Sequence, residues 1–227
     1  MAKSVLFETQ DGSHSLMSEE FGVSYHSKYG AIQESRHVFI EAGLYPAMAD
    51  KNKLRIFEMG FGTGLNAYLS LLIAEKKNKH IFYETVESHP ISKQQANSLN
   101  YPTILTAIGI DNEAADFIDL HQPSWNKVIE LKSSFSLLKW NKRIQDTLLT
   151  GKYDVVFYDA FAPSSQPELW EEAVISKVVN AMNPGGVFVT YCAKGVFKRL
   201  LKSLGLKVEG IPGPPGKREM TRGFKPN

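Results

Sequence analysis

Cysteine is nearly absent from this chain of 227 residues, in which Cys192 stands alone. A single cysteine excludes an intramolecular disulfide and any zinc motif built from cysteine pairs, and it favours a reducing, cytoplasmic setting. The six histidines have no paired spacing, so the sequence predicts no metal site. No apolar run approaches the ~20 residues that span a membrane, and no apolar segment typical of a signal peptide follows Met1. The oligomeric state is left open.

The chain as a whole has no large excess of positive or negative charge, but its C-terminal end is strongly basic. The net charge is +2, yet residues 193–227 carry nine lysines and arginines against Glu209 and Glu219, a local charge of +7. The remaining residues therefore carry −5. Such asymmetry indicates either a surface that binds a polyanion or a solvated helix face followed by a basic tail.

The order of apolar segments predicts one α/β domain. Strands are predicted at 54–59, 81–86, 153–158, 187–191, 207–211 and 219–224, with shorter strand-like runs at 128–131 and 134–138. Helices are predicted at 65–77, 91–99, 112–121, 142–150, 168–182 and 196–204. This alternation favours a doubly wound, mostly parallel sheet of seven strands within residues 51–227. Residues 1–50 are predicted to form a cap, made of a hairpin (5–8 with 15–17) and a helix (31–44) that Pro46 closes.

Three glycines follow the first strand of the predicted core. Gly60, Gly62 and Gly64 precede a helical pattern that begins at Leu65. Strand, glycine turn and helix form the layout of a nucleotide-binding unit, in which glycine permits positive φ and the close approach of a ligand. Leu65 occupies the position of the third glycine in a dinucleotide fingerprint. The spacing from Glu58 onward is instead similar to the first motif of S-adenosylmethionine (SAM) methyltransferases. A tight turn without a ligand is the alternative.

Acidic residues follow two further strands. Glu87 ends the strand 81–86, where a carboxylate can accept hydrogen bonds from both ribose hydroxyls. Asp159 follows the strand 153–158 and precedes Phe161 and Pro163. This segment is similar to the Asp-Pro-Pro-Tyr loops of methyltransferases that act on amines. An acid there orients the amine and takes a proton, and an aromatic ring stacks on a base or faces the sulfonium. The alternatives are an exposed strand-end carboxylate, a turn cap and a core phenylalanine.

Four ordered motifs together resemble the methyltransferase domain of the MnmC family, whose members complete 5-methylaminomethyl-2-thiouridine at the tRNA wobble position. The motifs are FEMGFGTGLN (57–66), DAFAP with PELW (159–163 and 167–170), GKREM (216–220), and spaced residues from Tyr25 to Phe39. The resemblance covers nearly the whole chain. It implies a class I, Rossmann-like SAM-dependent methyltransferase that acts on tRNA.

The resemblance also implies the site residues. The SAM site would be lined by Glu58, Gly60, Gly62, Gly64 and Asn66, with Glu87 on the ribose. The modified base and its amine would be bound by Asp159, Phe161 and Pro163. Tyr25 and Glu34 would close over the cofactor. Lys217 and Arg218 would lie at the site mouth or contact RNA phosphates.

The chain departs from this family in two respects. The flavin-dependent oxidase domain that usually follows is not among the 227 residues, so the expected substrate already carries a bare aminomethyl group. The family's Gly-Asp pair near the adenine has no counterpart between residues 131 and 149, where Asn141 and Asp146 are the polar residues considered. The adenine contact is therefore unassigned.

Two other functions remain open. One is a small-molecule amine methyltransferase or an aminopropyltransferase on the same fold, and the other is a non-catalytic RNA-binding subunit. The basic C-terminal end favours RNA over a polyamine, because a cationic substrate would prefer an acidic mouth. The intact glycine motif, Glu87 and Asp159 argue against a subunit without activity.

Overall fold

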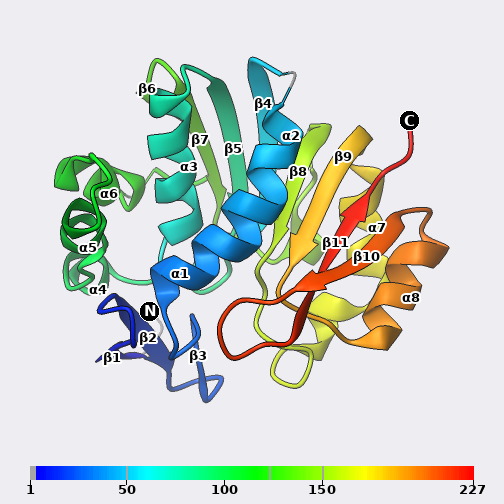
Figure 1. Cartoon of the computed structure of the whole chain (residues 1–227), viewed down its shortest axis with the longest axis horizontal. Coiled ribbons are helices and arrows are strands. Elements are labelled where there is room, and N and C mark those ends of the chain that lie inside the picture. The colour runs from blue at the N-terminus through cyan, green and yellow to red at the C-terminus, as the bar shows by residue number, and fades with distance from the viewer. Residues whose placement is uncertain (1–3, 50, 123, 150) are drawn as a thin grey trace.

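The computed structural model describes residues 4–49, 51–122, 124–149 and 151–227, and it is built on one mixed sheet (Figure 1). The strand order is β10 (Lys207–Pro212), β11 (Glu219–Phe224), β9 (Met182–Thr190), β8 (Tyr153–Tyr158), β4 (Lys53–Met59), β5 (His80–Val86), β7 (Phe135–Trp140) and β6 (Val128–Lys132). The five strands from β9 to β7 are mutually parallel, and β6 and β11 pair antiparallel with the outer members of that group. The α/β class is confirmed. The predicted count of seven strands is one too low: the sheet has eight, and the short predicted run at 128–131 is one of them, as β6, which folds back on β7.

Both faces of the sheet are covered, as expected for parallel strands with continuous apolar sequences. All six residues of β8 are buried, and they alternate between two core clusters: Val155 and Phe157 face one, Val156 and Tyr158 the other. The first cluster includes residues of η1 (Arg36–Leu44), α3 (Leu65–Lys76) and α6 (Ala114–Leu120), and the second includes residues of α7 (Glu172–Asn180) and α8 (Gly195–Ser203). The carboxyl ends of β4, β5 and β8 remain available for a ligand.

The N-terminal segment adds a small antiparallel sheet at one end of the large one (Figure 1). The predicted hairpin is confirmed as β1 (Ser4–Glu8) paired with β2 (His14–Ser18), and a short β3 (Val23–Ser24) extends it. Residues 1–3 and 50, which the predicted cap included, lie outside the described residues. No helix in the described ranges is both long and apolar enough to cross a membrane.

The predicted helix 31–44 is present, but Pro46 does not close it. It begins as α1 (Ala31–Ser35), continues as the π-helix η1 and ends as α2 (Tyr45–Met48), so Pro46 lies within the helical run, one residue after the change from π-helical to α-helical backbone. Gly43 brings η1 against the sheet, because a Cβ there would lie 2.7 Å from Val189 Cγ2. This long helix packs on β8 and β9 and places Glu34 near the site.

Three other helix predictions are wrong in part. Residues 142–149 contain only the short 3₁₀ helix η2 (Ile144–Asp146), because Leu148 is 80% exposed and the segment has no second apolar face to bury; Thr150 lies outside the description. Residues 168–182 divide into η3 (Pro167–Trp170) and α7, and residues 183–186 belong to β9 rather than to a helix stop. The helix predicted at 91–99 is α4 (Lys93–Asn97), capped by Ser92, and α5 (Tyr101–Ala107) was not predicted.

The C-terminal predictions agree more closely with the structure. Helix α8 matches the predicted 196–204 within one residue at each end, and Gly205 follows it with φ 89°, as a C-cap glycine does. Strands β10 and β11 agree with the strands predicted at 207–211 and 219–224, and they pair antiparallel. Strand β10 is at the edge of the sheet, and β11 lies between β10 and β9. The turn between them, residues 213–218, reaches toward the N-terminal segment (Figure 1).

Candidate functional site

A cavity of about 580 Å³ lies at the carboxyl ends of β4, β5 and β8. Seven of the predicted site residues line it: Tyr25, Gly60, Gly62, Asn66, Glu87, Asp159 and Phe161. Six predicted residues lie outside its lining: Glu34, Glu58, Gly64, Pro163, Lys217 and Arg218. The volume is in the usual range for small-molecule and cofactor sites. The fold therefore brings together both halves of the predicted site, the glycine turn and the Asp159 loop.

The backbone of the glycine turn has a conformation that residues other than glycine adopt only with strain. Gly60, Gly62 and Gly64 have φ of 87°, 50° and 75°. A Cβ on Gly60 would lie 3.1 Å from Asp159 O, and one on Gly62 would lie 3.1 Å from Tyr25 Cδ1. The first two glycines thus let the acceptor loop and the N-terminal segment approach the turn. Their backbone leaves open space for a ligand on the cavity side.

Gly64 serves a different purpose from its neighbours. It is the N-cap of α3, and a Cβ there would lie 2.8 Å from His121 Nε2 and 3.0 Å from Phe61. His121 is half-buried, and desolvation, reinforced by the charge of Lys139, lowers its pKa to about 3, so it is a neutral packing group beside the turn. The structure places Gly64 in helix packing behind the cavity rather than in its lining.

Glu87 lies directly across from the glycine turn. Its Oε2 accepts a hydrogen bond from Gly62 N at 3.0 Å, and its Oε1 accepts one from His89 N at 2.8 Å. Both bonds orient the carboxylate toward the cavity that Glu87 lines. A strand-end carboxylate held in this way can still accept ribose hydroxyls, because each oxygen has a second lone pair.

The buried carboxyl group of Glu58 and the half-buried one of Asp159 share one amide in the centre of the site. Asn66 Nδ2 donates to Glu58 Oε1 at 3.1 Å and to Asp159 Oδ2 at 2.9 Å. Burial, reinforced by the neighbouring Asp159, raises the pKa of Glu58 well above its usual range. Burial and the charge of Glu34 raise the pKa of Asp159 to about 7, against the hydrogen bond from Asn66 and the charge of Lys217. Asp159 is therefore poised to exchange a proton near neutral pH.

Aromatic rings form the wall beside Asp159. The Phe161 ring lies 5.1 Å from Tyr25 and 5.4 Å from Phe21, both of which come from the N-terminal segment. Trp170 Nε1 donates to Phe161 O at 2.8 Å and so fixes the loop that carries the ring. Pro163 is part of the same loop but lies behind the lining. The rings are inclined to one another, at 53° and 74° to Phe161, and the wall offers an aromatic surface to a base or another planar group.

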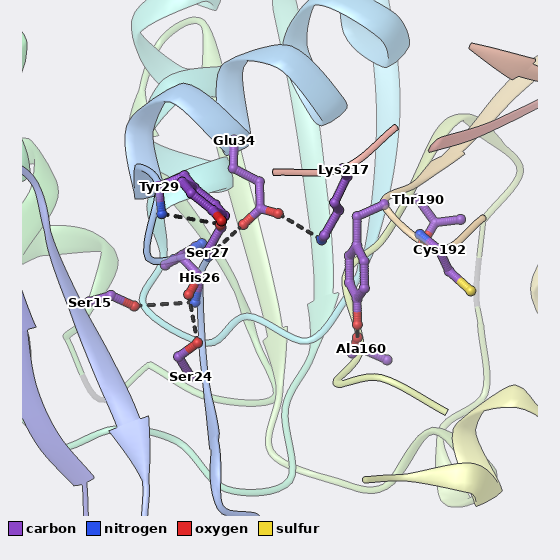
Figure 2. A network of polar contacts seen from close by, with 11 residues as sticks. Ser15, Ser24, His26, Ser27, Tyr29, Glu34, Ala160, Thr190, Cys192 and Lys217 are labelled. Atoms are coloured by element: carbon purple, nitrogen blue, oxygen red, sulfur yellow. Dashed lines mark hydrogen bonds and ion pairs between the residues drawn. The ribbon is translucent and has the colours of Figure 1, made fainter. Parts of the chain in front are cut away.

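A polar network links Asp159's loop to the N-terminal segment and the C-terminal turn (Figure 2). Glu34 Oε2 accepts from Ser27 N at 2.8 Å, and its Oε1 pairs with Lys217 Nζ at 2.9 Å. The Lys217 ammonium lies 3.9 Å from the centre of the Tyr191 ring, whose hydroxyl donates to Ala160 O at 2.7 Å. Glu34 and Lys217 are therefore positioned to act on Asp159 through charge and loop placement rather than by contact with a ligand in the cavity.

The basic C-terminal end is partly neutralised within the fold. Lys217 pairs with Glu34, Lys198 with Glu219 and Arg222 with Glu209. Arg218 is exposed, and its guanidinium has no ion pair among the described residues. Of the two residues predicted to contact RNA, Arg218 is therefore the one whose charge is free for phosphate.

Sequence reasoning missed several residues of the site. The cavity lining also includes Glu20, Phe21, His89 and the loop residues Lys142, Arg143 and Gln145. Glu20 lies 3.6 Å from His89 and so joins the N-terminal segment to the loop after β5. No periodic pattern marks these loop residues, although the segment 142–145 lies in the stretch where the adenine contact was unassigned.

The residues present fit SAM. Asn66 lines the cavity, yet its buried Oδ1 has no hydrogen-bond partner among the described residues, and an ammonium donor would satisfy it. Glu58 lies behind Asn66, 1% exposed, and so supports the amide rather than facing a ligand. The glycine turn lets a ligand approach the backbone closely, and Glu87 supplies the carboxylate that accepts hydrogen bonds from a ribose.

Comparison with known proteins agrees with this arrangement. A family model described as S-adenosyl-L-methionine-dependent methyltransferase matches residues 125–226. The chain is 31% identical over 220 residues to the "tRNA 5-methylaminomethyl-2-thiouridine biosynthesis bifunctional protein MnmC" of Marinomonas sp. (strain MWYL1), a match that covers 91% of this chain and 32% of the relative. The protein of the same name from Leptospira borgpetersenii is 28% identical over 218 residues, with 91% and 33% covered. The chain thus spans about a third of the length of these relatives.

A solved structure supports the fold. The crystal structure of MnmC2 from Aquifex aeolicus superposes with a TM-score of 0.78 and 23% identity, and the match covers all of this chain and 73% of that one. At this identity the likeness concerns the fold. The sequence matches, the shared fold and the site geometry together support an S-adenosyl-L-methionine-dependent methyltransferase with SAM as its cofactor.

Proposed function

We propose that this chain transfers the methyl group of SAM to the amine of a 5-aminomethyl-(2-thio)uridine at the wobble position of tRNA, giving 5-methylaminomethyl-(2-thio)uridine. The name of the relatives contains 5-methylaminomethyl-2-thiouridine, which supports this product. The protein would encounter such a tRNA in the cytoplasm. The observation that carries the proposal is Asp159, a cavity-lining carboxyl group with a pKa near 7 beside the ring of Phe161. A proton acceptor next to an aromatic wall suits an amine attached to a base.

The chain's own residues would bind both partners and move one proton. SAM, when bound, supplies a methyl carbon made electrophilic by its sulfonium. Gly60, Gly62 and Asn66 would hold this donor, and Glu87 would hold its ribose. Asp159 would take a proton from the substrate ammonium, which leaves the nitrogen with the lone pair that attack requires. The rings of Phe161 and Tyr25 would hold the base so that this nitrogen stays in line with the donor.

The N-terminal segment, residues 1–50, would act as a cap in this reaction. Its described part contributes Glu20, Phe21, Tyr25 and His26 to the cavity lining, and Phe21 and Tyr25 meet Phe161 there. A segment that supplies part of the wall can exclude water from the amine. We propose residues 51–227 as the core that holds the donor.

A small cationic amine is a second candidate substrate, favoured by the charge of the cavity. Five carboxyl groups line it, namely Glu20, Glu87, Asp159, Glu168 and Glu171, against the two cations Lys142 and Arg143. An acidic mouth attracts a free amine as well as an amine attached to RNA. The exposed Arg218 and the basic charge of residues 193–227 favour RNA.

The decisive experiment supplies the protein with methyl-labelled SAM and purified tRNA whose wobble uridine carries an unmethylated 5-aminomethyl group. Label should appear in 5-methylaminomethyl-(2-thio)uridine when the nucleosides are separated and identified by mass spectrometry. The same tRNA with an unmodified uridine is the matched control and should accept no label. Labelling of spermidine or of the free nucleoside at a higher kcat/KM than tRNA would favour the second candidate and overturn the first.

A further inference from the structure

Asn66 forms side-chain hydrogen bonds to both halves of the site. It stands in the first turn of α3, directly after the glycine turn, and its side chain is 3% exposed. Its Nδ2 group has two hydrogens, and the two acceptors within reach are Glu58 Oε1 on the donor side and Asp159 Oδ2 on the acceptor side. Both hydrogens are therefore used, and Asn66 Oδ1 is buried without a hydrogen-bond partner among the described residues.

The backbones of the two halves are locked together at the same place. Asp159 N donates to Met59 O at 3.1 Å, and Gly60 packs against Asp159 O. Because the shared amide and the locked backbone leave little room for relaxation, a change of charge on one carboxyl group acts directly on the other. Glu58 Oε2 forms no direct hydrogen bond, although the Tyr83 and Thr85 hydroxyls lie near enough to lower its pKa.

The charged and titratable groups around Asp159 come from five parts of the chain. Glu58 lies near the end of β4, Tyr83 on β5 and Glu34 on α1, whereas Lys217 belongs to the C-terminal turn and Tyr191 follows β9. Lys217 is the single cation in this set, and it is already paired with Glu34. Two neighbouring carboxyl groups with one shared neutral donor cannot both be charged at low cost. Burial raises the pKa of Glu58 well above its usual range, and Asp159, unlike Glu58, lines the cavity, so Asp159 is the group whose charge responds to a ligand there.

We propose that Glu58, Asn66 and Asp159 form one coupled proton site, in which the arrival of a cationic ligand in the cavity expels the proton of Asp159 while Asn66 holds the resulting carboxylate in place. Asn66 is a positioning residue in this arrangement, and Asp159 is the group that gains and loses the proton. The consequence is an order of events: the base becomes active only when the cationic donor is present, and it regains its proton once the positive charge has left.

This inference rests on the donor binding that the proposed function requires and is independent of the tRNA acceptor. SAM carries a sulfonium, whereas S-adenosylhomocysteine has the same shape without that charge. A coupled proton site must therefore distinguish the two ligands by the number of protons that they release. Each ligand carries an amino group of its own, so the comparison is made between the two ligands and repeated in variants.

The experiment is calorimetric titration of the full chain with SAM and, separately, with S-adenosylhomocysteine, at neutral pH in phosphate and in Tris. The heat difference between buffers gives the protons released on binding. Since Asp159 has a pKa near 7, SAM should release up to about half a proton more than S-adenosylhomocysteine. Asp159→Asn should bind both ligands and abolish this difference.

Two further variants separate the proposal from its rivals. Asn66→Ala removes the hydrogen bond that lowers the pKa of Asp159, so the difference between ligands should reach its maximum at higher pH; any lost contact to the ligands' common ammonium affects both equally. His89→Asn changes a titratable residue in the cavity lining and should leave the difference intact. Equal proton release for the two ligands, or a difference that survives Asp159→Asn or vanishes in His89→Asn, would overturn the proposal. If Asn66→Ala does not fold, the titrations of Asp159→Asn and His89→Asn still test the proposal.

Discussion

The donor side and the acceptor side of the cavity are held by different means. On the donor side, a single stretch from β4 through Gly64 into α3 fixes the turn, and its shape comes from positive φ at three glycines. On the acceptor side, the loop after β8 is held by side chains from distant segments. Trp170 and Tyr191 bind its carbonyl groups, Asn66 binds its carboxylate, and Tyr25 packs on its aromatic ring.

This difference has a physical consequence. A turn fixed by local backbone keeps its shape as long as its own residues can adopt the required φ. A loop fixed by long-range contacts depends on the packing of the N-terminal segment and the C-terminal turn as well. The electrostatics of Asp159 follow the same division, since Glu34 and Lys217 come from those two distant segments. Substitutions on the donor side should therefore affect affinity for SAM, and substitutions on the acceptor side should affect rate, pH dependence and the binding of RNA.

The largest effect is expected for Asp159→Asn. The variant keeps the shape of the side chain but removes the proton acceptor, so kcat should fall about 10²- to 10⁴-fold. The SAM dissociation constant from calorimetry should rise by a much smaller factor, because the donor side is held by its own backbone and loses only the favourable charge of Asp159. Asp119→Asn, on an exposed face of α6, is the matched control and should leave both quantities unchanged. Equal losses of rate and of SAM affinity would show that the two sides are not separate.

Gly62→Ala tests the donor side, and Gly205→Ala is its control. Both glycines have positive φ, 50° and 89°, so each alanine should cost about 1–2 kcal/mol of folding stability. Only Gly62 has a neighbour, Tyr25, 3.1 Å from the added Cβ, while Gly205 has open space. Both variants should therefore have a lower melting temperature, whereas SAM affinity should fall about tenfold in Gly62→Ala alone. A similar loss of affinity in both variants would attribute the effect to general destabilisation.

The same division explains what could be predicted from the sequence. The strand–turn–helix from β4 to α3 is local, and its glycine spacing and apolar pattern gave the correct elements and placed Gly60 and Gly62 at the cavity. Asp159 and Phe161 could be placed because the end of a buried strand has a known position in a parallel sheet. The contacts of Glu34 with Lys217, and of Tyr191 with Ala160, join residues far apart in sequence, and no periodicity records them. The same holds for the missed helix α5 and the overpredicted helix 142–150, where tertiary packing outweighed local pattern.

Lys217→Met and Glu34→Gln should move the activity profile in opposite directions. Asp159 must be deprotonated to act, so activity rises as pH passes through its pKa. Lys217 lowers this pKa and Glu34 raises it. Removing the lysine should therefore shift the rising limb of kcat/KM to higher pH, with a loss of activity at neutral pH, and neutralising the glutamate should shift it to lower pH. Lys217→Arg keeps the charge and should retain the parent profile. Shifts in one direction for both variants would mean that loop disorder, rather than charge, is responsible.

The smallest effect is expected for Arg218→Ala, which leaves the cavity untouched. Arg218 is exposed and free of ion pairs among the described residues, so its contribution should be a phosphate contact. The slope of log affinity for tRNA against log salt concentration should become shallower by about one, and SAM affinity and the pH profile should not change. Lys76→Ala is the control, because Lys76 is equally exposed but stands at the end of α3 remote from the glycine turn. Because Lys217 is paired and Arg218 is not, an unchanged slope in Arg218→Ala would move the RNA contact away from the C-terminal turn, toward the exposed cations of α8 or of the loop at 142–143.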